Sequence, residues 1–415
     1  MRKNMRRAGS AVLLAAVLGA VVGQPAMASG SAVEESAVDQ SAVDQSAVDQ
    51  SAGRSRTELR TALGAVADAS LGGGIVLRVN DRRGEWTSSA GSAELYGPVK
   101  PLPGNRFRAG SITKSFVATT VLQLVGEGKV ALDKPIADYL PRFGVDRRIT
   151  VRMLLQHRSG LFNYTGEPRA DGTIEAGIPL WGKEYLDNLF HDYRAEEHVR
   201  LALSKPARFE PGAKYSYSNT NYTLLGLLIE KITGTDYATQ VEKRIFRPLG
   251  MRDTSLPGSR TDIRGPHAHG YLTFKQDGKQ KVVDITRLNA SWAGAAGEII
   301  STTDDLDRFI TALLGGKLLK PQQLKEMRSF TETGAPGSRI GLGLFETEFA
   351  PGCTAVGHTG GTQGQTSYMY SRTDGSRRVE FSINHGALDR EDTPAAQRIA
   401  EATTKLATTA LCGKD

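Results

Sequence analysis

The stretch Phe107-Arg108-Ala109-Gly110-Ser111-Ile112-Thr113-Lys114-Ser115-Phe116 decides how the rest of the sequence is interpreted. Apolar residues follow it at helical spacing and predict an amphipathic helix: Val117, Val121, Leu122 and Val125. A serine at a helix start is usually just a cap. Residues three apart share one face of a helix, however, so Lys114 can reach the hydroxyl of Ser111. Serine is a weak nucleophile that needs a base, and a desolvated lysine can be neutral enough to serve.

Two further short motifs carry groups that could serve the same chemistry. Tyr217-Ser218-Asn219 precedes a predicted helix and offers a phenol for proton transfer and an amide that both donates and accepts. Gly357-His358-Thr359-Gly360-Gly361 precedes a predicted hairpin, and its glycines let a backbone N–H approach an oxyanion closely. Taken alone, each motif is typical of an ordinary turn or cap.

Strand patterns lie at both ends of the chain and helical patterns lie between them. Residues 74–79 and 85–87 flank one predicted turn, and residues 366–371 and 378–384 flank another. Predicted helices cover 115–127, 221–232 and 304–314. This order predicts a mixed α and β architecture, an antiparallel sheet assembled from both chain ends with a helical region inserted. The expected sheet part is about residues 54–105 and 290–415, the helical part is about 106–289, and a cleft between them is the expected ligand site.

The three motifs together, in this order and setting, resemble those of the penicillin-recognising serine hydrolases. From about Leu71 to Gly413 the chain is similar to secreted D-alanyl-D-alanine carboxypeptidases/transpeptidases and, more distantly, to class C β-lactamases. Further stretches support the resemblance: Arg106-Phe107-Arg108, Gln156-His157-Arg158-Ser159-Gly160-Leu161, Tyr215-Ser216-Tyr217-Ser218-Asn219-Thr220-Asn221, Ser291-Trp292, and the pair Cys353 and Cys412. The resemblance implies a β-lactamase/DD-peptidase-like fold with no cofactor.

The same resemblance assigns a role to each motif residue. It implies Ser111 as the acylated nucleophile, Lys114 as its proton partner and Tyr217 as a general acid/base, without deciding which of the last two takes the first proton. The remaining implied roles concern the substrate: Asn219 binds its amide, Trp292 lines the cleft, His358 and Thr359 form the third motif, and the N–H groups of Ser111 and Gly361 form the oxyanion hole. His358 is further expected to change charge in the working pH range.

The N-terminal sequence predicts export. Residues 1–28 have the basic start, apolar run and small-residue ending of a signal peptide, and an uncleaved anchor helix is the alternative. Residues 29–53 contain a five-residue repeat and are expected to be a disordered acidic spacer. The body, 54–415, is therefore expected to be secreted, monomeric and without a stable membrane anchor. Its two cysteines, Cys353 and Cys412, are expected to pair in an oxidising compartment, and two free buried thiols are the alternative.

Composition and missing motifs narrow the other classes. Hydrophobic residues make up 39% of the chain and charged residues 23%, an ordinary globular balance. The net charge is +7, but basic and acidic residues are interspersed along the chain. This mixture disfavours nucleic acid as a partner. The pair His267 and His269 lies in a Gly- and Pro-flanked segment and is not expected to hold a metal. The sequence contains no Gly-x-Ser-x-Gly motif for an α/β-hydrolase nucleophile elbow.

The expected function is a DD-peptidase that acts on peptidoglycan-type stem peptides and is acylated by β-lactams. The alternatives are a D-amino-acid peptidase, amidase or esterase of the same fold, a class C-type β-lactamase, and a non-catalytic penicillin-binding protein. One departure bears on this choice. Carboxypeptidases of this type carry an arginine for the substrate carboxylate after a Gly-Leu-Gly-Leu-like run, and here Phe345 follows that run, with Arg339 the nearest cation in sequence. The loop 166–189 also departs from the carboxypeptidase.

Overall fold

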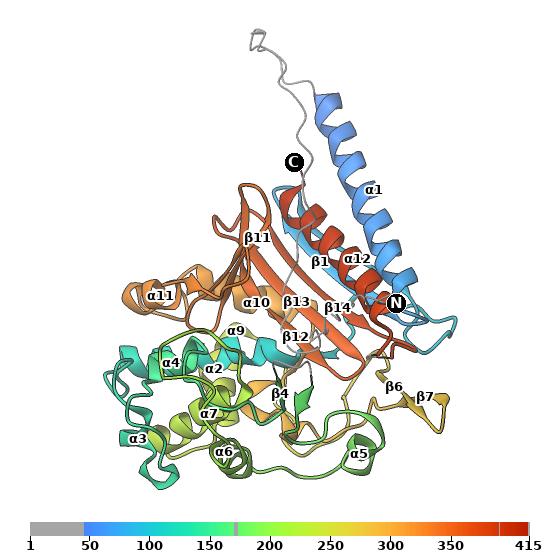
Figure 1. The fold of residues 1–415 in the computed structure, drawn as a ribbon. Helices are drawn as coiled ribbons and strands as arrows, with labels where there is room; N and C mark the ends of the chain where they lie inside the picture. The colour runs from blue at the N-terminus through green and yellow to red at the C-terminus, as the bar shows by residue number, and fades with distance from the viewer. Residues whose placement is uncertain (1–44, 170–172, 390, 414–415) are drawn as a thin grey trace, which may run out of the picture.

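An eight-stranded antiparallel sheet organises the part of the chain that the computed structural model describes, residues 45–169, 173–389 and 391–413, with side chains described from residue 56 onward (Figure 1). The sheet joins both ends of the chain, because β1 and β14 are neighbours. In spatial order the strands are β2 (Gly84–Gly91), β1 (Gly74–Asp81), β14 (Arg378–Asn384), β13 (Gln365–Arg372), β12 (Cys353–Thr362), β11 (Phe345–Ala350), β10 (Ser338–Ile340) and β9 (Thr331–Glu332).

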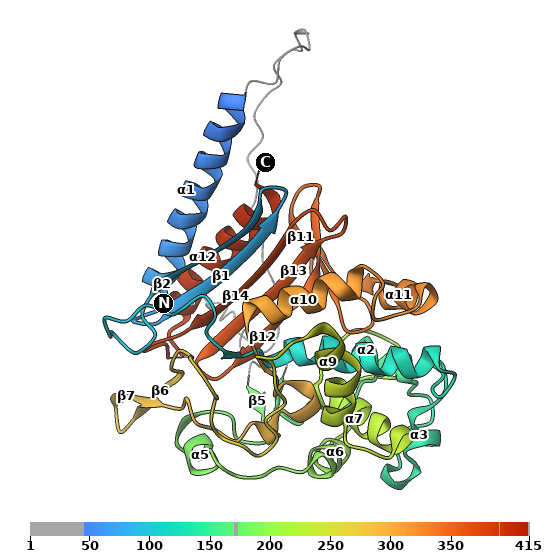
Figure 2. The same ribbon diagram turned by 180° about the vertical axis from the view of Figure 1, so that it is seen from behind.

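Helices lie on both faces of this sheet. Figures 1 and 2 show α1 and α12 on one face, and α10 on the other beside the helices of the inserted region. The helices are α1 (Gln45–Ala69), α2 (Thr113–Gly126), α3 (Ile136–Tyr139), α4 (Val151–Leu155), α5 (Gly182–Asp187), α6 (Ala195–Leu203), α7 (Asn219–Thr233), α8 (Tyr237–Val241), α9 (Arg247–Leu249), α10 (Thr303–Leu314), α11 (Pro321–Met327) and α12 (Thr393–Cys412).

Short two-stranded pairs complete the strands outside the main sheet. They are β3 (Phe107–Arg108) with β8 (Ile300–Ser301), β4 (Glu167–Pro168) with β5 (Ile174–Glu175), and β6 (Tyr271–Gln276) with β7 (Lys279–Asp284). The first pair matters for function, because β3 leads directly into the Ser111 segment and β8 follows the Trp292 segment.

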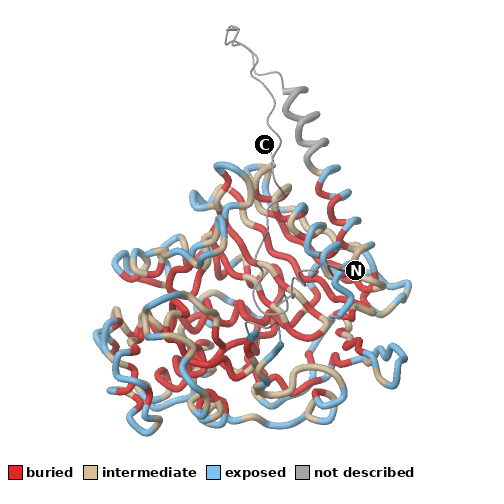
Figure 3. Tube along the Cα trace, in the orientation of Figure 1, coloured by how far each residue is buried: buried red, intermediate tan, exposed pale blue. Residues whose placement is uncertain are grey.

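Side chains alternate along β1 between two hydrophobic cores, one on each face of the sheet. Ile75, Leu77 and Val79 pack toward α1 and α12, whereas Val76 packs with the helices on the opposite face. Burying one such side chain stabilises the fold by about 1.5 to 3 kcal/mol. The buried trace in Figure 3 runs through the centre of the sheet and continues into the helical region. The helix α2 is enclosed in the core that contains Val76, and this burial fixes the Ser111 segment against the sheet.

The expected architecture is confirmed: strands from the two chain ends form one antiparallel sheet, and a mostly helical region is inserted between them. Among the described residues, no helix combines the length and apolar character needed to cross a bilayer. The expected signal peptide, residues 1–28, and residues 29–44 of the expected spacer lie outside the described residues.

The spacer prediction is wrong for residues 45–53, which form the first turns of α1. Valines five residues apart in the repeat step about 140° around a helix and form no apolar stripe, so the repeat alone is not expected to fold. Its alanine and glutamine residues are good helix formers, however, and extending a helix that is already nucleated costs little. The nucleus is the later part of α1, where Leu59, Leu63 and Val66 are buried against the sheet and α12. Figure 1 shows α1 continuing beyond the body of the molecule.

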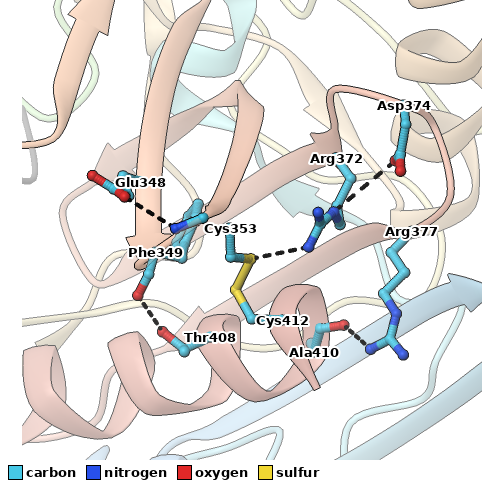
Figure 4. The surroundings of a disulfide bond; sticks show 10 residues. Glu348, Phe349, Cys353, Arg372, Asp374, Arg377, Thr408, Ala410 and Cys412 are labelled. Atoms are coloured by element: carbon cyan, nitrogen blue, oxygen red, sulfur yellow. Dashed lines mark hydrogen bonds and ion pairs between the residues drawn. A yellow bond between two sulfur atoms is a disulfide. The ribbon is translucent and has the colours of Figure 1, made fainter. Parts of the chain in front are cut away.

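A disulfide joins Cys353 at the start of β12 to Cys412 at the end of α12, with the two Cα atoms 5.8 Å apart. Figure 4 shows the contacts around it: Arg372 Nη1 lies 3.4 Å from Cys353 Sγ, and Thr408 donates to the carbonyl of Phe349. The bridge therefore fixes the C-terminal helix to the strand that carries the third sequence motif.

Candidate active site

Ser111 lies in the short helical turn Gly110–Ile112 that leads into α2, and its side chain is almost buried at 6% exposure. The preceding Gly110 has φ +54°, a conformation that favours glycine. A Cβ at Gly110 would lie only 2.6 Å from the backbone nitrogen of Gly361 on β12. Glycine is therefore required for the turn and for its close approach to β12. This approach brings the first and third motifs together.

Lys114 lies one turn further along, is fully buried, and directs its side-chain nitrogen at three oxygens. Lys114 Nζ is 3.0 Å from Ser111 Oγ, 2.8 Å from Asn219 Oδ1 and 2.6 Å from the carbonyl oxygen of Ala296. Burial holds the pKa of Lys114 well below its usual value. All three partners are uncharged, so the lysine can lose its proton without leaving a carboxylate unpaired.

Tyr217 approaches Ser111 from the other side. Its hydroxyl donates to Ser111 Oγ at 2.7 Å, and its ring lies 4.8 Å from Lys114 Nζ. Desolvation raises the pKa of Tyr217, although the bond to Ser111 opposes this shift. Both the lysine and the tyrosine are therefore favoured in their neutral forms, one as a base and the other as an acid.

Asn219 begins α7 and is held by groups from the segment before β4. Its backbone N–H donates to Asn163 Oδ1 at 3.0 Å, and its Nδ2 donates to Thr165 Oγ1 at 3.1 Å. Its Oδ1 accepts from Lys114. In this structure the amide expected to bind substrate instead connects the lysine to the surrounding loop.

The third motif lies on β12, as expected. Gly361 pairs with Thr366 and contacts the Ser111 turn, and Thr359 is half-buried beside it. His358 is buried and donates from Nδ1 to the carbonyl oxygen of Thr359 at 2.5 Å. Burial lowers the pKa of His358 to about 3. The expectation that His358 changes charge near neutral pH is therefore wrong, because the sequence did not reveal its burial.

Phe345, the residue in the place of the carboxylate-binding arginine, packs against the same strand. Its ring meets the His358 ring edge-on at 5.1 Å and the Tyr215 ring at 6.5 Å. Arg339, the expected substitute, pairs with Glu346 on the neighbouring strand. Arg339 therefore already has a carboxylate partner, and the rings of Phe345 and Tyr215 beside His358 form what we call the aromatic wall.

Trp292 is 4% exposed in the turn Ala290–Trp292, and its carbonyl accepts from the hydroxyl of Tyr164 at 2.9 Å. Its indole N–H is buried without a hydrogen-bond partner. The Trp292 side chain is therefore more deeply buried than a residue that lines an open cleft, as it was expected to do.

Three contributors were not expected from the sequence: the carbonyl of Ala296 and the side chains of Asn163 and Thr165. The small residues around Ala296, Gly294-Ala295-Ala296-Gly297, were a usable signal, since they permit close backbone approach. Among the described residues, histidine, cysteine and carboxylate side chains do not gather in a group of three that could hold a metal ion. His269 instead pairs with Asp284, with 2.6 Å between Nδ1 and Oδ2.

The sheet and this serine-lysine-tyrosine cluster define a serine hydrolase of the β-lactamase and penicillin-binding superfamily. The chain belongs to the β-lactamase family, since the family described as Beta-lactamase matches residues 60–404.

Solved structures and curated relatives extend this finding. The chain is similar to a D-stereospecific amidohydrolase from Streptomyces sp., with 34% identity, a TM-score of 0.75, and 86% of this chain and 99% of the other covered. It is also similar to D-amino acid amidase from Ochrobactrum anthropi SV3, with 27% identity, a TM-score of 0.70, and coverage of 85% and 98%. A D-aminopeptidase from Brucella anthropi is 29% identical over 328 residues, 76% of this chain. The match spans 57% of that longer protein.

Proposed function

We propose that this protein is a secreted hydrolase that cleaves amide bonds next to D-amino acid residues. The substrate acylates Ser111 during the reaction, and β-lactams acylate the same serine. The observation that carries the proposal is the aromatic wall at Phe345, 5.1 Å from His358. A phenyl ring cannot form the paired, charge-assisted bonds that a guanidinium makes to a carboxylate. The similar amidohydrolase, amidase and D-aminopeptidase support the D-amino acid peptidase and amidase alternative over the DD-carboxypeptidase.

The hydrogen bonds of Lys114 suggest which group takes the first proton. A neutral lysine has two N–H donors and one lone pair, and the structure offers two acceptors, Asn219 Oδ1 and Ala296 O, together with the hydroxyl of Ser111. Each group then has a partner when Ser111 donates to Lys114 and accepts from Tyr217. We therefore assign Lys114 as the base and Tyr217 as the acid.

Acylation and deacylation balance with these two groups. Ser111 Oγ attacks the carbonyl carbon, its proton passes to Lys114, the C–N bond breaks, and the leaving nitrogen takes a proton from Tyr217. Water then attacks the ester and gives a proton to the Tyr217 phenolate. Ser111 leaves and recovers its proton from Lys114. Backbone N–H groups of Ser111 and Gly361 stabilise the oxyanion in both steps, a contribution of about 10²- to 10³-fold per donor in comparable sites.

The test compares matched substrates that share one acyl group and carry a C-terminal D-Ala as either the free acid or the amide. We expect kcat/KM values within about threefold of each other. A preference for the free acid of about a hundredfold, or about 2.7 kcal/mol, would overturn the proposal in favour of a DD-carboxypeptidase. A p-nitrophenyl ester and a chromogenic cephalosporin in the same panel measure esterase and β-lactamase activity.

Fluorescent penicillin tests the nucleophile independently of substrate choice. The protein should be labelled covalently, and Ser111→Ala should abolish the label. Labelling of the alanine variant would show that another residue is acylated. Labelling of the unaltered chain without turnover of any substrate in the panel would identify a non-catalytic penicillin-binding protein.

A further inference from the structure

His157 has a backbone conformation that histidine rarely adopts. It follows α4 and has φ +55°, in the left-handed region that usually holds glycine at the end of a helix. A side chain in this region is strained and persists only where the surroundings impose the conformation. His157 is also 1% exposed, so its ring is fixed inside the protein.

Three contacts of His157 fall on consecutive residues centred on Tyr217, beside looser ring contacts to Tyr215 and Tyr222. The carbonyl oxygen of His157 accepts from the backbone N–H of Ser216 at 2.8 Å. Its Nδ1 accepts from the backbone N–H of Ser218 at 3.1 Å. Its ring stacks on the Tyr217 ring, with 4.3 Å between centroids and 28° between planes. The histidine therefore fixes the backbone on both sides of the tyrosine and one face of its ring.

His157 contributes a fixed position and shape to the site rather than a charge. Burial and the nearby Lys114 lower the pKa of His157 well below its usual value, so the ring is neutral. Because Nδ1 accepts from Ser218, the proton of the neutral ring lies on Nε2. Asn221 Nδ2, 3.3 Å from Nδ1, adds a second donor on the same side.

We infer that His157 is a positioning residue that holds the Tyr217 hydroxyl on Ser111 Oγ, so that the tyrosine stays aligned for proton transfer. The inference rests on the proposed acid role of Tyr217. The contacts of His157 flank Tyr217, whose hydroxyl bonds to Ser111 at 2.7 Å. Small rotations of the tyrosine would break this alignment, and a displacement of about 1 Å can cost about 10²-fold in rate.

Three variants separate the two kinds of contact. His157→Phe keeps a flat ring under Tyr217 and removes the acceptor for Ser218. His157→Asn keeps an acceptor at the position of Nδ1, tolerates positive φ and removes the ring. His157→Gly removes both and relieves the backbone strain. We expect kcat to fall about tenfold to a hundredfold in the glycine variant with KM within about threefold, and less in each of the other two.

A double-mutant cycle with Tyr217→Phe decides whether the effect passes through the tyrosine. If it does, adding His157→Gly to Tyr217→Phe should lower kcat by less than about twofold further. An equal loss in both backgrounds would overturn the inference and leave the proposed function intact. If Tyr217→Phe alone left kcat unchanged, the proposed acid role would fail first. Thermal unfolding of each variant checks that it folds.

His198→Phe provides a matched control. His198 lies on α6 and is also buried, and its ring is stacked on a tyrosine, Tyr164, at 4.1 Å. Its other aromatic contact is Tyr193, and neither tyrosine is Tyr217. Its replacement should leave kcat within about twofold. A loss in His198→Phe as large as that in His157→Gly would overturn the inference, because any buried histidine would then have the same effect.

Discussion

Replacing Asn219 with aspartate should convert the base of this site into a cation. Asn219→Asp preserves the shape of the side chain and places a carboxylate oxygen 2.8 Å from Lys114 Nζ, where a neutral amide oxygen now lies. Lys114 has a lowered pKa because it is buried among uncharged partners. The new carboxylate stabilises the ammonium form, and an ammonium has no lone pair to accept the proton of Ser111.

The separation sets the size of the effect. At an effective dielectric constant of about 20, unit charges 2.8 Å apart attract by about 6 kcal/mol. Part of this attraction is lost in burying the new carboxylate. We therefore expect the pKa of Lys114 to rise by about one to three units, the usual range for a close opposite charge. At a pH below that pKa, each unit by which the pKa of Lys114 rises lowers the neutral fraction of the lysine about tenfold. The value of kcat/KM falls by the same factor.

The assay is a pH profile of kcat/KM or of the rate of penicillin acylation. The rate should increase with pH as Lys114 loses its proton, so raising its pKa moves this acidic limb toward higher pH. Asn219→Ala removes the acceptor without adding charge and should lower the rate without an upward shift of the limb. An acidic limb at the same pH in Asn219→Asp and the unaltered enzyme would refute the assignment of neutral Lys114 as the base.

Three further predictions follow from residues around the site and in the core. Phe345→Arg should raise the kcat/KM ratio of free-acid to amidated substrate at least about tenfold, and an unchanged ratio would mean that the aromatic wall does not set this selectivity. Glu380 is buried with both carboxylate oxygens unpartnered, and burial raises its pKa, so its folded state loses stability as pH rises through the interval between the unfolded and folded pKa values. Glu380→Gln should therefore add about 1 to 3 kcal/mol in denaturant unfolding at pH 8 and less at pH 4, and equal gains at both would contradict this account. Cys412→Ser opens a loop with a sequence separation of 59 and should cost about 4 kcal/mol in unfolding while kcat/KM stays within about twofold, whereas loss of activity in the folded variant would show that the bridge shapes the site.

The sequence predicted the fold well where local patterns were strong. The hairpin signals at residues 74–87 and 366–384 correspond to β1, β2, β13 and β14, and the apolar spacing after Ser111 corresponds to α2. Residues 45–53 were mispredicted because their helix continues from a packed segment, which no property of the repeat reveals.

Within the site, the side chains that share a motif were predictable, and the groups brought in by packing were not. Ser111, Lys114 and Tyr217 meet because a helical spacing and a familiar motif order specify them. The carbonyl of Ala296 reaches Lys114 from 182 residues away. The small residues around Ala296 permit a close backbone approach, but they do not specify which group the backbone approaches. The charge state of His358 depends on burial, which neither its type nor its motif contains.

The pairing of β1 with β14 also determines when in its own synthesis this enzyme becomes complete. Ser111 and Lys114 leave the ribosome long before residues 378–384 of β14. The strand that contacts the Ser111 turn, β12, lies between β11 and β13, and all three are made late in synthesis. Contacts so distant in sequence make folding slow and close the sheet last. An unfinished chain therefore carries its nucleophile without β12 and without the sheet that fixes it. We therefore expect a chain that lacks β12, β13 and β14 to be inactive until these strands have been made and paired.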